Sequence, residues 1–158
     1  MAEKYYPNDN PMIGVGEPVK WHLYLYNHMA EAQYVAVKVK LLGPGVEPPN
    51  TTSCTPSPAP TIFEIRRVMT NNETWLSPFE WAIVSLEKKD GLLNLTALKI
   101  NDQTLNIGLL APDSGQLRMV FELWLYDKNT GDFRFSWISD GSNQCVWNQI
   151  WFNVTSTV

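Results

Sequence analysis

The segment QLRMVFELWLY, residues 116–126, decides the fold class of this chain. Its odd-numbered positions, from Leu117 to Leu125, are all apolar. Because successive side chains of a β-strand point to opposite faces, this alternation predicts a strand with one buried face and one wetter face. The wetter face would carry Arg118, Glu122, Trp124 and Tyr126.

The same two-residue period recurs along most of the chain, and no stretch has a helical period. Strands are expected at 18–26, 33–41, 62–68, 80–87, 92–100, 104–109, 116–126, 133–137 and 145–155. The first two should form a hairpin or lie side by side, with Lys38 and Lys40 on the outer face of the second. We therefore predict an all-β fold, an immunoglobulin-like antiparallel β-sandwich of about eight or nine strands. A length of 158 residues suits a single domain, residues 1–158.

Three segments are expected to be irregular. Residues 1–16 contain prolines and glycines that interrupt any regular element. The Pro-rich loop, residues 43–60, holds six of the eleven prolines. Proline has no N–H and a fixed φ, so it excludes a central strand there. The third irregular stretch is bracketed by Asn71, Asn72 and Pro78.

Composition narrows the classes of partner. The formal net charge is −4, and Lys and Arg do not cluster, which argues against nucleic acid and against an anionic membrane surface. No apolar stretch approaches the roughly 18–20 residues that cross a bilayer, and the N-terminus has no apolar leader. The chain is rich in aromatic residues, which suit a pleated surface.

Cys54 and Cys145 are the only cysteines, and they lie far apart in the sequence. A redox couple usually has the close spacing C-x-x-C, so that function is disfavoured. A disulfide would tie the Pro-rich loop to the last strand and would require an oxidising compartment. We predict this disulfide, with two reduced thiols as the alternative.

Four segments match the N-glycosylation pattern N-x-[ST], at Asn50, Asn72, Asn94 and Asn153. These matches favour a glycosylated domain outside the cytoplasm. The alternative is that Asn and Thr simply populate polar strand edges and turns.

No motif supports catalysis or a metal site. His22 and His28 are the only histidines, and on one strand they would lie about 20 Å apart, too far to share a metal. The turn DKNTGD, residues 127–132, begins like a calcium loop but has no Glu at the closing position, so it is interpreted as a hairpin turn. The carboxylates are scattered, and nothing in the spacing of Glu64, Glu80 and Glu122 predicts a catalytic pair. We predict no enzyme activity and no cofactor.

Residues 113–119 (DSGQLRM) partly match the D-x-G-x-Y-x-C pattern at strand F of immunoglobulin domains. Leu117 and Met119 replace its Tyr and Cys, so the tyrosine corner is lost. An ordinary turn before a strand explains the segment equally well.

Trp147, Gln149 and Trp151 share one face of the last expected strand. The two indoles would stand about 13 Å apart with an amide between them, which suits a sugar ring and its hydroxyls. The alternative is that this face packs under the Pro-rich loop. On the opposite face, Asn148 would then need a buried partner.

The opening strands, GEPVKWHLYLYNH at 16–28 and VKVKL at 37–41, resemble an archaeal family of predicted membrane proteins of unknown function. The closing strands, FELWLY at 121–126 and WNQIWFNVT at 147–155, are similar to those of the same family. The resemblance implies membrane helices followed by an extracytoplasmic sandwich, hence a possible membrane tether in a full-length protein. It implies no catalytic residues, and the insert with Cys54 departs from its pattern.

We expect an extracellular or cell-surface interaction module of the cell envelope, whose partner is an envelope protein or a glycan. One alternative is a carbohydrate-binding sandwich that uses Trp147 and Trp151. Another is a self-assembling surface or filament subunit that uses an open sheet edge.

Overall fold

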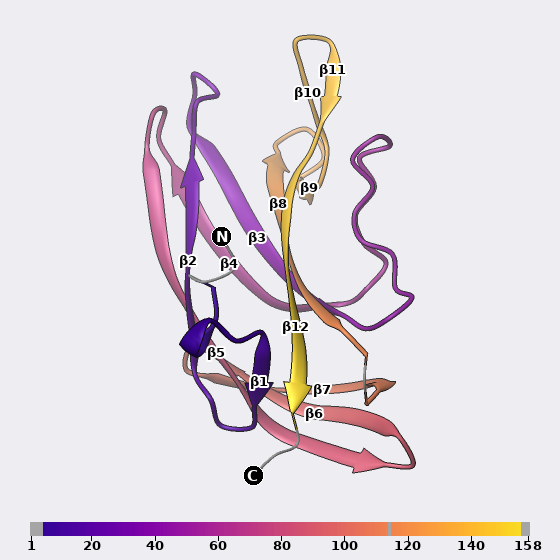
Figure 1. Ribbon diagram of the computed structural model, residues 1–158. Helices are drawn as coiled ribbons and strands as arrows, with labels where there is room; N and C mark the ends of the chain where they lie inside the picture. Colours follow the sequence, from indigo (N-terminus) through magenta and orange to yellow (C-terminus); the bar gives the residue numbers. More distant parts are fainter. Residues whose placement is uncertain (1–4, 114, 156–158) are drawn as a thin grey trace.

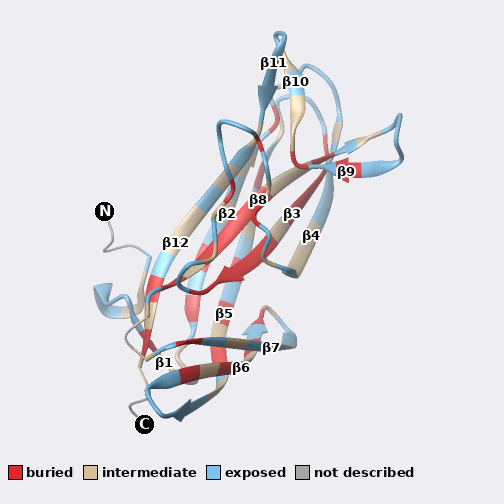
Figure 2. Cartoon of the chain, turned by 90° about the vertical axis from the view of Figure 1, so that its right-hand side faces the viewer, coloured by how far each residue is buried: buried red, intermediate tan, exposed pale blue. Residues whose placement is uncertain are grey.

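The computed structural model describes residues 5–113 and 115–155, which form two stacked β-sheets and a separate two-stranded hairpin (Figure 1). Figure 2 shows the same chain turned by 90° and coloured by burial. The expected all-β sandwich is confirmed. The long strands are β2 (Val19–Tyr26), β3 (Gln33–Leu42), β4 (Thr61–Met69), β5 (Thr74–Lys89), β6 (Leu92–Ile100), β7 (Gln103–Pro112), β8 (Leu117–Asp127) and β12 (Val146–Thr155). The short elements are η2 (Pro7–Asp9), β1 (Met12–Gly14), β9 (Asp132–Arg134), β10 (Trp137–Ser139) and β11 (Ser142–Gln144). Within the described residues, no helix has the length and apolarity of a membrane span.

The first sheet has the strand order β1-β12-β8-β3-β4, and β9 pairs with the end of β8. Its pairings are antiparallel except that of β1 with β12, which is parallel. The central strand β8 has the predicted inner face, with Leu117 and Met119 almost fully buried. The fold-deciding alternation therefore lies at the centre of this sheet.

The second sheet has the order β2-β5-β6-β7. The first half of β5 pairs with β2, and the second half pairs with β6. The register shifts between Ile83 and Leu86, and such irregularities bend a strand. The second half of β5 and the hairpin β6–β7 accordingly lie across the lower end of the molecule in Figure 1.

Aromatic rings join the two sheets. Phe79 of β5 is fully buried, and its ring centroid lies 5.1 Å from that of Phe121 on β8. Trp81 lies 4.8 Å from Phe152 in the same way. Burial of each such ring stabilises the fold by roughly 2 kcal/mol.

Two expectations about the first part of the chain were wrong. β2 and β3 are not neighbours, because β2 pairs with β5 in one sheet whereas β3 pairs with β4 and β8 in the other. Residues 1–16 are not wholly irregular, because β1 pairs with β12 and buries Ile13 completely. A pattern of alternation marks strands, but it does not say which strands pair.

The expected irregular stretch before residue 80 was also wrong, since β5 begins at Thr74 and includes Pro78. Proline is tolerated there because this half of β5 has β2 as its one neighbour among the described strands. Pro78 lies opposite His22, and its missing N–H leaves the hydrogen bonds of the flanking pairs intact.

Two side chains expected on wet faces are buried. Lys40 of β3 is 4% exposed and Glu122 of β8 is 0% exposed. Both lie on the outer face of the first sheet, as the alternation requires. The Pro-rich loop covers them, and alternation along a strand cannot reveal what a distant loop covers.

Candidate functional site

The Pro-rich loop, residues 43–60, lies over the outer face of the first sheet and is called the strap below. Cys54 of the strap and Cys145 beside β12 form the predicted disulfide, with their Cα atoms 5.5 Å apart. Trp147 donates a hydrogen bond of 3.2 Å from its Nε1 to Thr51 Oγ1 of the strap. These contacts fix the middle of the strap against β12.

A buried ion pair fixes the end of the strap. Lys40 Nζ lies 3.0 Å from Glu122 Oε2 and donates to the Ser57 carbonyl at 2.6 Å. The Ser57 N–H donates to Glu122 Oε1 at 2.8 Å, and Trp124 Nε1 donates to Glu122 Oε2 at 3.0 Å. Every oxygen of the buried carboxylate thus has a partner, as the burial of a charge requires.

The remaining candidate sugar-binding residues contact Arg118. Its guanidinium carbon lies 4.4 Å from the centroid of the Trp151 ring, and its Nη1 donates to Gln149 Oε1 at 3.5 Å. Arg118 also donates to the Val46 carbonyl of the strap at 2.6 Å. Trp151 is 38% exposed, so one part of its ring still faces solvent. The sugar site at Trp147, Gln149 and Trp151 stays a prediction, on a face that the strap partly covers.

Asn148 is exposed rather than buried, which contradicts the expected buried partner. It lies near the start of β12 and lines a groove between β12 and β2, so its side chain stays accessible to solvent. Its Oδ1 accepts a hydrogen bond of 2.7 Å from the N–H of Gln149.

The four sequons occupy different environments. Asn50 and Asn72 are exposed on connections between strands. Asn94 and Asn153 are half-buried within β6 and β12, and Asn94 Oδ1 has no hydrogen-bond partner in the described structure. Only the first two therefore present their side chains openly, and whether any carries a glycan stays a prediction.

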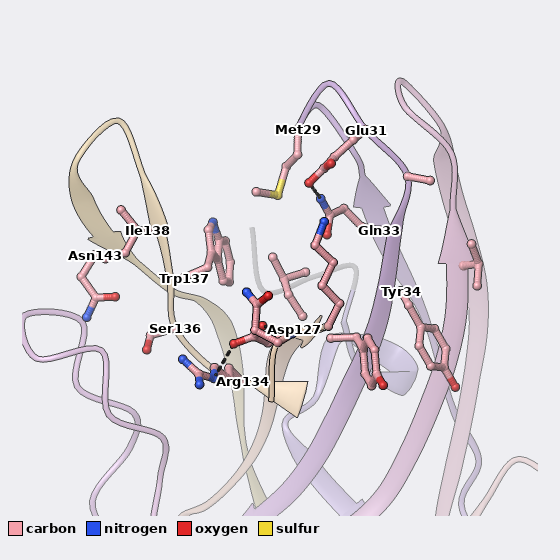
Figure 3. Close-up of a pocket in the computed structure, with 16 residues that line it drawn as sticks. Met29, Glu31, Gln33, Tyr34, Asp127, Arg134, Ser136, Trp137, Ile138 and Asn143 are labelled. Carbon is pink, nitrogen blue, oxygen red and sulfur yellow. Dashed lines mark hydrogen bonds and ion pairs between the residues drawn. The ribbon is translucent and has the colours of Figure 1, made fainter. Parts of the chain in front are cut away.

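A second candidate site, the loop-end pocket, lies where three connections meet at one end of the sandwich (Figure 3). Its volume is about 750 Å³. Figure 3 shows Trp137 and Asn143 on the β10–β11 side, facing Met29, Glu31 and Gln33 on the opposite side. The other lining residues are Ala32, Tyr34, Val68, Leu125, Tyr126, Asp127, Lys128, Asn129, Arg134, Ser136 and Ile138.

The β2–β3 wall of this pocket is held by the side chain of Asn27, which is buried. Its Nδ2 donates to the Glu31 carbonyl at 2.8 Å, to the Met69 carbonyl at 3.2 Å and to the Thr70 carbonyl at 3.0 Å. Its Oδ1 accepts from the N–H of Met29 at 3.1 Å. The connection is therefore preorganised, although it has no regular secondary structure.

The floor of the pocket is the turn that follows β8. Asp127 accepts a hydrogen bond of 2.8 Å from the N–H of Asn129, and this bond is the main cause that holds the pKa of Asp127 below its usual value. Arg134 Nε lies 2.9 Å from Asp127 Oδ2 and adds to the effect. The carboxylate is thus kept charged, with a cation beside it.

The pocket combines an indole, amides and charged groups, and hydrogen bonds and an ion pair hold its walls in place. Tyr34, Tyr126 and Phe133 form an aromatic cluster behind the floor, with ring centroids 5.0–5.7 Å apart. Trp137 is half-buried and offers a flat apolar surface, while Gln33 and Asn143 offer donors and acceptors. Such a set can bind a ligand that has both apolar C–H faces and hydroxyl groups.

The three glutamates considered in the sequence analysis lie on different strands. Glu80 lies in the second sheet, whereas Glu64 and Glu122 lie on the two strands that flank β3, where Lys38 is opposite both. Their ion-pair partners are Lys20 for Glu80, Lys38 for Glu64 and Lys40 for Glu122. Across 5–113 and 115–155, no group of three His, Cys, Asp or Glu side chains could hold a metal ion. Ser114 of the D-x-G segment lies outside the described residues.

No family model, curated protein or solved structure matches this chain.

Sequence reasoning missed the loop-end pocket. Trp137, Gln33 and Asp127 are distant in sequence and meet only because β8 pairs with β3. The available signal was a group of aromatic and polar residues in two segments, the β2–β3 connection and the segment between β8 and β12. That signal has meaning only when the pairing order of the strands is known.

Proposed function

We propose that this protein is an extracytoplasmic binding module of the cell envelope, and that the loop-end pocket takes a glycan. The observation that supports the proposal is the pocket itself, which has a volume of about 750 Å³ and is lined by Trp137 together with amide and carboxylate groups. The partner is a polysaccharide or the glycan of an envelope protein. The role is one of binding and not of catalysis.

Placement outside the cytoplasm rests on two features. The disulfide between Cys54 and Cys145 forms in oxidising compartments. Asn50 and Asn72 are exposed sequons that a glycosylating enzyme could reach. Mass spectrometry of native protein tests this placement: bare asparagines at all four sequons together with two free thiols would contradict it.

The order of strands supports an immunoglobulin-like topology. The sheet β12-β8-β3-β4 corresponds to the G-F-C-C′ sheet, and β2 with β5 corresponds to B and E. In this correspondence the pocket lies at the end where variable domains carry their binding loops. The hairpin β6–β7 and the disulfide between strap and β12 are departures from the pattern.

We further propose that the chain is a relative of the archaeal membrane-associated family that its opening and closing strands resemble. A full-length protein would then hold the sandwich outside the cell on a membrane tether. Detection of the native protein in the membrane fraction, and its release by protease from intact cells, would test the tether.

A glycan array followed by titration calorimetry tests the binding function. Wild type should bind at least one class of glycan, and Trp137→Ala should weaken that binding by tenfold or more because it removes the flat surface. Trp151→Ala is the matched control, since it removes an indole of β12 that does not line the loop-end pocket.

The two variants also separate the two candidate sugar sites. Loss of binding in Trp151→Ala alone would place the ligand at Trp147, Gln149 and Trp151 and would overturn the loop-end assignment. Absence of any glycan binding by the folded wild type would overturn the proposed function.

A further inference from the structure

The edge strands of the sandwich differ in how they are protected against pairing with other chains. β4 carries Glu64, Arg66 and Arg67, all of which form ion pairs. β7 pairs with β6 through a shifted register and contains Gly108 at a φ of 68°. Charges and irregular backbone are the usual devices that block edge-to-edge pairing.

The outer edge of β12 is also protected. β1 covers its last residues, from Asn153 to Thr155. Higher up, the Tyr6 hydroxyl donates to the Trp151 carbonyl, and Asn148 Oδ1 accepts from the Gln149 N–H. Side chains and the N-terminal segment therefore occupy several backbone groups of this edge.

β2 has none of these devices. It is eight residues long, contains no proline, glycine or register shift, and pairs with β5 as its one partner among the described strands. Its exposed face carries Tyr24 and Tyr26, which are 67% and 49% exposed. Lys20 is the sole charge of the strand, and Glu80 already pairs with it.

The backbone groups that β2 leaves free can be identified. The Asn27 N–H donates to the Glu73 carbonyl on the β5 side, and this direction alternates along a strand. The N–H and C=O groups of Lys20, His22, Tyr24 and Tyr26 therefore point away from β5. The Glu80 carbonyl supports this assignment, because it accepts from Asn101 on the side away from Lys20.

An apolar groove lies beside this edge. Its volume is about 610 Å³, and it separates β2 from the upper part of β12. The apolar side chains that line it include Trp21, Leu23, Leu25, Leu123 and Ile150. A strand that pairs with β2 would close the groove along one side and would remove these side chains from water.

We propose that β2 is an interface on which a second copy of this chain docks, strand against strand, about a twofold axis through Leu23. A twofold axis perpendicular to the sheet keeps inner faces on one side, so the groove side chains of both copies would meet. Pairing centred on Leu23 places His22 opposite the partner's Tyr24 and Lys20 opposite the partner's Tyr26. In this register all four edge-facing residues find hydrogen-bonded partners.

Charge and shape favour a second copy in this register. Each lysine meets an aromatic ring rather than another cation, so no like charges oppose one another. Shifting the centre to His22 would pair Tyr26 with Pro18, which has no N–H to donate. The register centred on Leu23 therefore pairs all four edge-facing residues within the strand and avoids Pro18.

Sedimentation equilibrium of the intact chain over a range of concentrations tests the interface. Wild type should dimerise reversibly. Tyr24→Pro removes an edge-facing N–H without touching the β2–β5 ladder, so it should abolish the dimer while the circular-dichroism spectrum stays unchanged. Tyr24→Ala keeps the N–H and should retain the dimer.

Charge variants test the register without altering the backbone. Tyr26→Lys sets a cation opposite the partner's Lys20 and should weaken the dimer by about tenfold, whereas Tyr26→Glu should leave it intact or tighter. The proposal is overturned if wild type is monomeric at all concentrations. It is overturned even if that monomer binds an unrelated strand-forming peptide at β2, because the occupant would then not be a second copy. It is equally overturned if the dimer persists unchanged in both Tyr24→Pro and Tyr26→Lys.

Discussion

At the scale of single residues, the buried pair of Lys40 and Glu122 determines how the strap is held. Their neighbours in sequence, such as Val39 and Phe121, are buried in the core, so Lys40 and Glu122 point to the outer face of the sheet, where the strap covers them. A buried charge that loses its partner is costly, whereas an exposed one is not.

Lys40→Met should lower the free energy of unfolding by about 3–5 kcal/mol, because the Glu122 carboxylate would stay buried without its cation. Lys20→Met is the matched control, since its pair with Glu80 is exposed, and it should cost less than about 1 kcal/mol. Urea denaturation measures both. If both variants lost the same free energy of unfolding, burial would not be the reason that the pair of Lys40 and Glu122 matters.

The free energy of unfolding at acid pH should depend on Asp127 and Glu73. Hydrogen bonds from the backbone of Asn129 and of Thr70, respectively, are the first causes that hold the pKa of each carboxylate below its usual value. A lowered pKa in the folded state contributes stability above the pKa of the unfolded state, and this stability is lost as the pH falls through the folded value. The free energy of unfolding should therefore fall below about pH 4.

Denaturation of wild type between pH 7 and pH 2 would measure this loss. Asp127→Asn cannot titrate, so its profile should be flatter than that of wild type over the same range. A wild-type stability that rises on acidification would refute the assignment.

At the scale of elements, the strap behaves as a long loop whose order comes from its attachments rather than from its own backbone. Its backbone bonds to itself in an isolated bridge between Asn50 and Thr55 and in a turn where the Val46 N–H donates to the Gly43 carbonyl. The disulfide, the buried ion pair and Arg118 hold it to β12, β3 and β8.

Replacement of both cysteines, Cys54→Ser with Cys145→Ser, should destabilise the protein by about 4–5 kcal/mol, because the bridge spans 91 positions of the unfolded chain. It should also expose the strap to proteolysis. Limited digestion with mapping of the cuts would check this, and cuts that avoid residues 43–60 would count against it.

At the scale of the whole molecule, one apolar core extends through both sheets. It includes residues of β1, β2, β3, β5, β6, β8 and β12. Since Phe79, Trp21 and Phe121 are in ring contact across the sheets, loss of one sheet would expose the other. This arrangement is what a single cooperative domain requires.

We expect one unfolding transition, coincident by tryptophan fluorescence and circular dichroism. Phe79→Ala should lower the unfolding free energy by about 3–5 kcal/mol through the cavity that it leaves. Val84→Ala, at an exposed position of the same strand, should change it by about 0.5 kcal/mol or less. Two separate transitions in wild type would contradict a single domain.

The sequence by itself determined that this chain is a β-sandwich, where most of its strands lie, and which face of β8 is buried at Leu117 and Met119. Those features follow from local alternation, which any pleated strand imposes on its own residues. Only the tertiary structure decided that β2 and β3 belong to different sheets, that the strap buries Glu122, and that Trp137 meets Gln33 in a pocket. These features depend on contacts between segments that are distant in the chain. Such contacts do not produce a periodic pattern in the sequence of either segment, so the sequence of one segment cannot predict them.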